Sequence, residues 1–238
     1  MSSPRVAILT TAHDQHAELL HQVEAIALGT AIPVLHVLVA MDDKTLGKRQ
    51  LPVTSDRWET IVRTARTDTR GPLPIAAARN LAAATAIDEG CDVLIFLDAH
   101  LIPGPRLVQV AAARTGSSRH TAPVLWIGEV RALEAPVGPG QPVHGLEART
   151  RQDNPPLLPS DYESVLAEPS AVSPGVPVIR AEGFRATDGF PLATTGELDL
   201  DTAFAAQVRS AGGTLVRFGG GPSYQQAQGV QRRGHPAG

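Results

Sequence analysis

The chain has a single cysteine, Cys91, and only 4% of its 238 residues are aromatic. One cysteine excludes an internal disulfide bond and is typical of a protein from a reducing compartment. No apolar run is long enough to cross a bilayer, and the apolar run near the N-terminus is too short for a signal peptide. We therefore expect a cytoplasmic protein without an integral membrane segment.

An excess of positive charge is also missing. The net charge is −3 and the isoelectric point is near 6.2, whereas proteins that bind nucleic acid usually present a basic surface. We therefore expect no nucleic-acid partner. Hydrophobic residues make up 42% of the chain and charged residues 19%, which is ordinary for a globular protein. The abundance of Ala, Gly, Pro and Arg indicates a bacterial genome rich in G and C.

Strand and helix patterns alternate in the first half of the chain. Short apolar runs predict strands, and apolar residues at helical spacing predict helices. The predicted strands cover 5–12, 33–43, 60–64 and 93–97, and the predicted helices cover 14–28, 74–89 and 103–115. Strands that alternate with helices form βαβ units. The expected fold is therefore α/β, with a mostly parallel central sheet and helices on both faces.

The second half has a less regular pattern. Residues 134–176 are rich in Pro and Gly and show little periodicity, which is typical of a functional or mobile loop. On either side of this loop we predict strands at 124–133 and 214–220 and a helix at 201–212, and a regular pattern of unassigned type returns at 176–184. We interpret residues 1–238 as one domain with a long loop inserted into it.

Polar side chains lie at the carboxyl ends of three of the predicted strands. These residues are Thr10, Thr11, Asp42, Asp43, Asp98 and His100. Because ligands of open α/β sheets bind at the carboxyl ends of the strands, we expect the three strand ends to converge on one crevice. For Asp42 and Asp43, a role in capping a turn is an equally acceptable interpretation.

The segment "DVLIFLDAH" (92–100) ends in a carboxylate and an imidazole. Residues two apart at the end of a strand point the same way, so Asp98 and His100 are expected to reach one point. A carboxylate oxygen and a neutral imidazole nitrogen suit a divalent cation such as Mn²⁺, which can bridge the oxygens of a diphosphate. The alternative is that Asp98 caps a helix beside a surface histidine.

A longer pattern covers most of the chain. The segments "VAILTTAHDQHAELLHQVEAIALGT", "HVLVAMDD" and "LPIAAARNLAAATAIDEGCDVLIFLDAHLIPGP" resemble the nucleotide-binding half of family 2 glycosyltransferases of the GT-A fold. The resemblance implies a Rossmann-like fold. Residues 1–115 would bind a nucleotide-diphospho-sugar, and residues 116–238 would form the acceptor and catalytic half around the 134–176 loop.

The same resemblance implies roles for single residues. Asp42 would contact the base, and Arg79 of the Ala-Arg-Asn motif would hydrogen-bond a uracil carbonyl or a phosphate. With the strand ends included, we assign donor binding to Thr10, Asp42, Arg79 and Asp98. The family usually has Asp-x-Asp where this chain has His100 in the second position. The polypeptide N-acetylgalactosaminyltransferases have a similar Asp-x-His strand, so Mn²⁺ or Mg²⁺ held by Asp98 and His100 is still implied.

The segment "TDGFPLATTGELDLDTAF" (187–204) resembles the galactosyltransferase-type region of some bacterial members. Gly189 and Phe190 match its Gly-Phe pair. The Glu-Asp-x-Asp motif of that region falls on Leu200, Asp201 and Ala203, so one carboxylate of the three is retained.

An inverting transfer needs a carboxylate that takes a proton from the acceptor hydroxyl. Asp201 is the candidate for this base, with Asp199 and Glu197 as substitutes. The alternative is that Asp199 or Asp201 caps the helix that follows.

Histidines that the resemblance places after the last strand are missing. The segment "GGGPSYQQAQGVQRR" has Gln225, Gln226 and Gln228 there instead. Glutamine is a poor ligand for such a metal, so the third protein ligand is left open, and His235 could substitute only if the C-terminal tail folds back.

The remaining histidines give weaker signals. His13, His16 and His21 are expected at the surface rather than as ligands. A contact between His144, in the long loop, and an acceptor is left open.

We therefore expect an inverting glycosyltransferase with a UDP-linked donor and a small-molecule acceptor; whether it forms a homodimer is left open. Leu200, Ala203 and the glutamines favour an alternative, a non-catalytic domain that binds a nucleotide or a protein partner. A nucleotidylyltransferase is disfavoured, because "TTAHDQH" lacks the Gly-rich basic loop that such an enzyme needs after its first strand.

Overall fold

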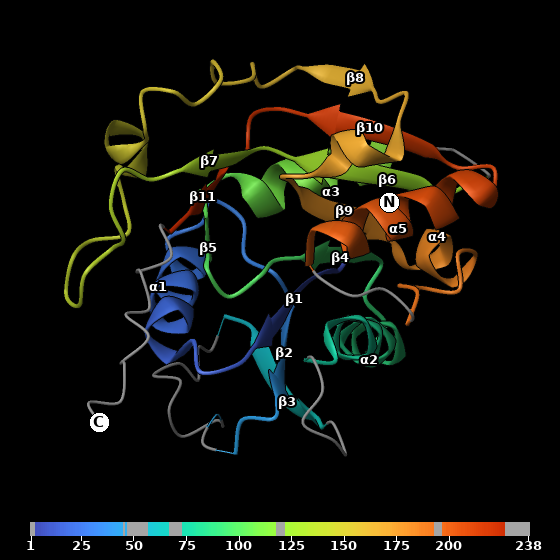
Figure 1. Ribbon diagram of the computed structural model, residues 1–238, viewed down its shortest axis with the longest axis horizontal. Coiled ribbons are helices and arrows are strands. Elements are labelled where there is room, and N and C mark those ends of the chain that lie inside the picture. The colour runs from blue at the N-terminus through green and yellow to red at the C-terminus, as the bar shows by residue number, and fades with distance from the viewer. Residues whose placement is uncertain are drawn as a thin grey trace, which may run out of the picture.

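The computed structural model describes residues 3–44, 46, 57–66, 73–117, 122–192 and 197–226, with the backbone alone at 117 and 197–199. Figure 1 shows a central sheet with helices on both faces and a smaller sheet beside it. Within the described residues, no helix combines the length and the hydropathy that are needed to cross a bilayer.

The central sheet has the strand order β3-β2-β1-β4-β9-β6-β10-β8. Its strands are β1 (Val6–Ala12), β2 (Leu35–Met41), β3 (Glu59–Ala65), β4 (Val93–Phe96), β6 (Val124–Gly128), β8 (Glu163–Val165), β9 (Val176–Arg180) and β10 (Thr214–Phe218). Pairs β1–β2, β1–β4, β2–β3 and β6–β10 are parallel, whereas β4–β9, β6–β9 and β8–β10 are antiparallel. The prediction of an α/β fold with a mostly parallel sheet is confirmed.

Two layers of helices cover the central sheet. One layer contains α1 (His16–Ala27) and α3 (Leu107–Ser117), and the other contains α2 (Ile75–Asp88), α4 (Ala181–Arg185) and α5 (Glu197–Ser210). Each layer buries its own apolar cluster against the sheet. Strands β1 and β2 are buried at every position, which explains why they appear in the sequence as continuous apolar runs.

A second sheet has the order β5-β11-β7 and consists of β5 (Leu101–Pro103), β11 (Ser223–Gln225) and β7 (Val130–Ala132). The sequence pattern predicts neither β5 nor β11, because three residues are too few to show alternation. It also predicts one strand over 124–133. The chain instead leaves the central sheet after Gly128 and joins the second sheet at Val130.

Further predictions for the second half of the chain differ from the structure. The 134–176 segment contains two short 3₁₀ helices, Leu146–Arg149 and Pro169–Val172, as well as β8, which forms an edge of the central sheet. The regular segment 176–184 consists of β9 up to Arg180 and the start of α4 after it. Helix α5 begins at Glu197, earlier than the predicted start at 201.

Candidate functional site

Arg79 of α2 lies between two carboxylates. Its Nη1 donates to Asp201 Oδ1 at 2.6 Å, and its Nη2 donates to Asp98 Oδ1 at 2.8 Å and Oδ2 at 3.1 Å. The Arg79 side chain is 3% exposed, and its Cζ lies 5.2 Å from the centroid of the Phe190 ring. Three segments that are distant in sequence, namely α2, the end of β4 and α5, therefore meet at one buried cation.

The two carboxylates differ in proton affinity. Burial favours the neutral form of Asp98, but the charges of Arg79 and His100 outweigh it and lower the pKa of Asp98. Burial raises the pKa of Asp201, and the neighbouring Asp98 adds to this effect against the opposing charge of Arg79. Asp201 is therefore the carboxylate of this pair that takes up a proton more readily.

Asn80, beside Arg79, joins α2 to the segment after α4. Its Nδ2 donates to Phe190 O at 2.8 Å, and Phe190 N donates to Asn80 Oδ1 at 2.8 Å. Gly189 has a φ of +75°, and a Cβ there would lie 2.6 Å from Asn80 Oδ1. Because only glycine accepts this conformation and this close approach, the Ala-Arg-Asn motif and the Gly-Phe pair form one structural unit. The sequence contains both motifs without showing that they bind each other.

Asp98 and His100 lie in a tight turn after β4. Strand β4 ends at Phe96, and Leu101 N donates to Asp98 O at 2.9 Å. The strand alternation from which a shared direction is predicted therefore stops before Asp98. The charge of His100 helps to lower the pKa of Asp98, and the convergence of the two side chains on one cation stays a prediction.

A buried chain of hydrogen bonds holds this turn. Gln22 Nε2 donates to Asp98 O at 2.9 Å and to Leu101 O at 3.0 Å. Thr10 Oγ1 donates to Gln22 Oε1 at 2.8 Å, and His36 Nε2 lies 3.1 Å from Thr10 Oγ1. The Thr10 hydroxyl donates its one proton to Gln22, so it must accept a hydrogen bond from His36. The neutral His36 ring therefore carries its proton on Nε2.

This chain of hydrogen bonds gives Thr10 a role in positioning. Thr10 is 0% exposed, and its hydroxyl bonds to Gln22 and His36. It therefore contacts the Asp98 turn only indirectly, through Gln22. Its direct contact with a nucleotide stays a prediction. Burial lowers the pKa of His36 to about 4, so the ring that supports Thr10 is neutral at physiological pH.

Asp42 and Asp43 have different surroundings at the end of β2. Asp42 is exposed and has a φ of +49°. Its contact with the nucleobase of a donor stays a prediction. Asp43 is buried and accepts from Leu46 N at 3.0 Å and from Asp14 N at 3.3 Å. His16 Nε2 also lies 2.7 Å from Asp43 Oδ2. Asp43 therefore fastens the loops after β1 and β2 to each other.

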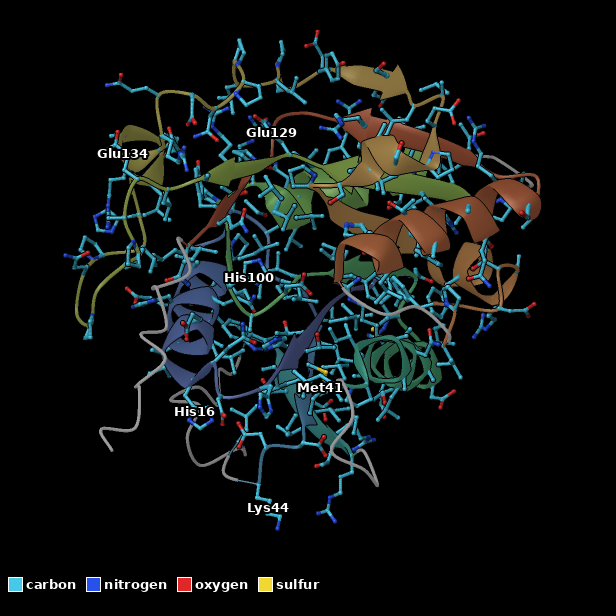
Figure 2. All side chains as sticks on the ribbon, viewed as in Figure 1. His16, Met41, Lys44, His100, Glu129 and Glu134 are labelled. Atoms are coloured by element: carbon cyan, nitrogen blue, oxygen red, sulfur yellow. The ribbon has the colours of Figure 1, made fainter. Side chains whose placement is uncertain are left out.

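Asp14, His16 and Asp43 form a cluster that could hold a metal ion. In the described part of the chain, it is the cluster that unites at least three His, Cys, Asp or Glu side chains. One ligand atom from each lies within 4.8 Å of the others. Figure 2 shows His16 at the start of α1 and His100 well above it, so this group is separate from the Asp98 turn. The chain therefore offers two candidate cation sites, and the sequence analysis placed His16 at the surface without linking it to Asp43.

Gln226 occupies a position where the resemblance predicts a histidine. Its backbone N donates to His100 O at 3.1 Å, and its Oε1 lies 3.2 Å from His21 Nδ1. The expectation that His21 lies at the surface is wrong, because His21 is only 8% exposed. The reason is that His21 contacts Gln226, directly after β11, a strand that the sequence pattern does not predict.

Four predicted residues lie outside the part that the structure describes: the side chains of Glu197 and Asp199, and all of Gln228 and His235. Asp199 and Asp201 both lie within α5, which begins at Glu197. A capping residue precedes the first helical residue, so the capping interpretation of these aspartates is wrong.

No protein-family model and no curated protein matches the chain in sequence. Among solved structures, S. aureus TarS 1–349 in complex with UDP-GlcNAc matches with a TM-score of 0.66 and 12% identity, over 95% of this chain and 60% of that one. GalNAc-T7 with UDP, GalNAc and Mn²⁺ matches with a TM-score of 0.64 and 14% identity, over 94% of this chain and 44% of that one. The chain thus spans less than two thirds of either structure.

At these identities the likeness concerns the fold. Both matched proteins are glycosyltransferases of the GT-A fold, and the match extends over nearly the whole of this chain. The edge of the sheet where Arg79, Asp98 and Asp201 meet is also the edge at which α/β sheets bind their ligands. The chain has the GT-A glycosyltransferase fold.

Proposed function

We propose that the chain is a glycosyltransferase that moves a sugar from a nucleotide-diphospho-sugar to a hydroxyl group of a small-molecule acceptor. The observation that carries the proposal is the Arg79 bridge, in which one buried guanidinium contacts both Asp98 and Asp201. TarS and GalNAc-T7 bind UDP-GlcNAc and UDP, respectively. UDP is accordingly the nucleotide proposed here.

Asp98 and His100 are the proposed protein ligands of a divalent cation, Mn²⁺ or Mg²⁺. Their donor set fits this role, because the lowered pKa of Asp98 keeps its carboxylate charged and an imidazole nitrogen suits Mn²⁺. Such a cation would neutralise charge on the departing diphosphate. Arg79 supplies a fixed second positive charge at the same place. Asp42 is the proposed contact of the nucleobase of the donor.

Asp201 is the proposed base. The acceptor oxygen forms a bond with the anomeric carbon on one face of the sugar while the bond to the diphosphate breaks on the other, which inverts the configuration. The hydroxyl proton passes to the Asp201 carboxylate, and the bonding electrons leave with UDP. The raised pKa of Asp201 makes it a better proton acceptor than an ordinary aspartate. Asp199 and Glu197 are the substitutes.

A second function, binding without transfer, is favoured by the state of Asp201. Its Oδ1 accepts from Arg79 at 2.6 Å, and Leu200 and Ala203 leave the rest of the expected acidic motif without carboxylates. A domain that binds a nucleotide or a protein partner would need Arg79 and Asp98 but no base.

Donor consumption distinguishes the two functions. UDP-GlcNAc, UDP-GalNAc and UDP-glucose are incubated with the protein with and without Mn²⁺, and released UDP is measured. We expect release that depends on Mn²⁺ and that Asp201→Asn abolishes without weakening UDP binding. If UDP with Mn²⁺ raises the melting temperature but no donor is consumed, binding without transfer is correct. If no nucleotide raises it, transfer and nucleotide binding are both wrong.

The cation site is tested by a matched pair of histidine variants. We expect His100→Ala to remove the Mn²⁺ dependence of UDP binding and His16→Ala to preserve it. The reverse result would place the cation between Asp14 and Asp43 and would refute the assignment to Asp98.

A further inference from the structure

Figure 1 shows that α1, β5 and β11 come together. A pocket lies there, near the C-terminal end of α1. Its volume is about 270 Å³, close to the lower end of the range of roughly 300–1,000 Å³ for small-molecule sites. We call it the α1 pocket, and its lining includes Ala25, Leu28, Val143, Leu146, Glu147 and Tyr224.

The α1 pocket is distinct from the Arg79 site. Strand β5 begins beside His100, and the pocket touches Pro103 at the other end of this strand. Similarly, Gln22 in the middle of α1 contacts the Asp98 turn, whereas the pocket touches Leu28 just after the helix. A ligand in the α1 pocket would therefore not occupy the Arg79 site.

Tyr224 gives the α1 pocket an unsatisfied polar group. The residue is 1% exposed, and its hydroxyl lies beside the Glu147 carboxylate, but it completes a well-aligned hydrogen bond neither to this carboxylate nor to any other described residue. A buried hydroxyl without a partner is costly, and folded proteins leave very few of them. A ligand in the pocket is a natural partner for this hydroxyl.

Charge in the α1 pocket favours a cation. Glu147 is the acidic group of its lining, and His144 is the other titratable side chain besides Tyr224. Burial, and then the neighbouring Glu147 carboxylate, raise the pKa of Tyr224 against the opposing charge of Arg131, so its hydroxyl stays protonated and neutral. A carboxylate only accepts hydrogen bonds, so a complementary ligand carries N–H donors. The apolar lining calls for an apolar body.

We propose that the α1 pocket is a second binding site and that it takes a small organic amine. The apolar body of the ligand lies against Leu28, Val143 and Leu146. Its ammonium group donates to the Glu147 carboxylate and to the oxygen of Tyr224.

The two tyrosines of the chain allow a direct test by ¹⁹F NMR. Protein labelled with 3-fluorotyrosine gives one resonance each for Tyr162 and Tyr224, and Tyr162→Phe assigns them. On titration with 2-phenylethylamine we expect a saturable shift of the Tyr224 resonance and none for Tyr162. Phenylacetate, of similar size and opposite charge, should bind at least about tenfold more weakly, since its carboxylate faces Glu147. No saturable shift with the amine, or equal affinity for both probes, would overturn the proposal.

Variants locate the bound amine. Glu147→Gln should weaken amine binding about threefold or more, as expected for a partly exposed ion pair, while the matched control Glu168→Gln should not. Leu28 is 52% exposed at the rim, so Leu28→Trp should fill the pocket and abolish the shift while the Tyr162 resonance, as a check on folding, stays in place. Amine binding that is unchanged in both Glu147→Gln and Leu28→Trp would also overturn the proposal.

Discussion

Arg79 contacts Asp98 and Asp201 through different nitrogens, at 2.8 and 2.6 Å. Because the guanidinium is buried and the two carboxylates are half-buried, replacing Arg79 would leave both carboxylates without a counter-ion, at a cost approaching about 3–5 kcal/mol. Arg79 variants would therefore report on folding as well as on function. Asp98→Asn and Asp201→Asn keep the shape of the site and one carboxylate each, so they separate the two roles.

The opposite pKa shifts of Asp98 and Asp201 predict how the site responds to acid. As the pH falls, Asp201 gains its proton first because its pKa is raised, and Asp98 stays charged longer because its pKa is lowered. We expect turnover to fall at a pH at which UDP binding is still intact. Parallel measurements of kcat and of the Kd for UDP between pH 8 and pH 4.5 test this. A simultaneous loss of both would contradict the assignment of base and cation ligand.

His36 predicts a second, structural dependence on pH. Its pKa is about 4 in the folded protein and near 6.5 in an unfolded chain. Between these values the unfolded state binds more protons, so the free energy of unfolding decreases as the pH is lowered. Between pH 7 and pH 5 the loss from this residue is about 2 kcal/mol. Urea unfolding of the wild type and of His36→Gln at both pH values should show a smaller loss in the variant. Equal losses would mean that His36 is not the group responsible.

At the scale of structural elements, the contact of Asn80 with Phe190 fastens α2 to the segment before α5. Gly189→Ala tests it, because the new Cβ would lie 2.6 Å from Asn80 Oδ1 at a φ of +75°. Gly212→Ala is a matched control, since Gly212 has the same φ of +75° and nothing within 4 Å of its added Cβ. We expect Gly212→Ala to cost about 1 kcal/mol and Gly189→Ala to cost at least roughly 1 kcal/mol more. If Gly189→Ala and Gly212→Ala lower the melting temperature equally, the close approach of Gly189 to Asn80 does not contribute to stability.

Elements with a strong pattern could be predicted from the sequence, and short ones could not. The apolar runs of β1 and β2 and the helical spacing in α1 gave boundaries within a few residues of those observed. Strands β5 and β11 have three residues each, and their pairing depends on contacts between distant parts of the chain. The burial of His21 follows from that packing, so it was missed for the same reason.

At the scale of the whole molecule, the motifs located the site but not its internal contacts. The Ala-Arg-Asn motif, the Asp-x-His turn and Asp201 were each marked by their residue types. That Arg79 joins Asp98 to Asp201 depends on how α2, β4 and α5 pack around Phe190, which no local pattern contains. The grouping of Asp14 with His16 and Asp43 likewise depends on two loops that meet only in the folded chain.

Binding of a nucleoside diphosphate at Asp98 and Arg79 is the function on which the proposed transfer, cation site and base all depend. Calorimetric titration of UDP in the presence of Mn²⁺ tests it on the wild type, on Asp98→Asn and on Asp161→Asn, which changes an exposed aspartate outside the crevice. We predict equal Kd values for the wild type and Asp161→Asn, and a Kd at least about tenfold higher for Asp98→Asn, which corresponds to roughly 1.4 kcal/mol. Binding of UDP to Asp98→Asn as tight as to the wild type would contradict the claim.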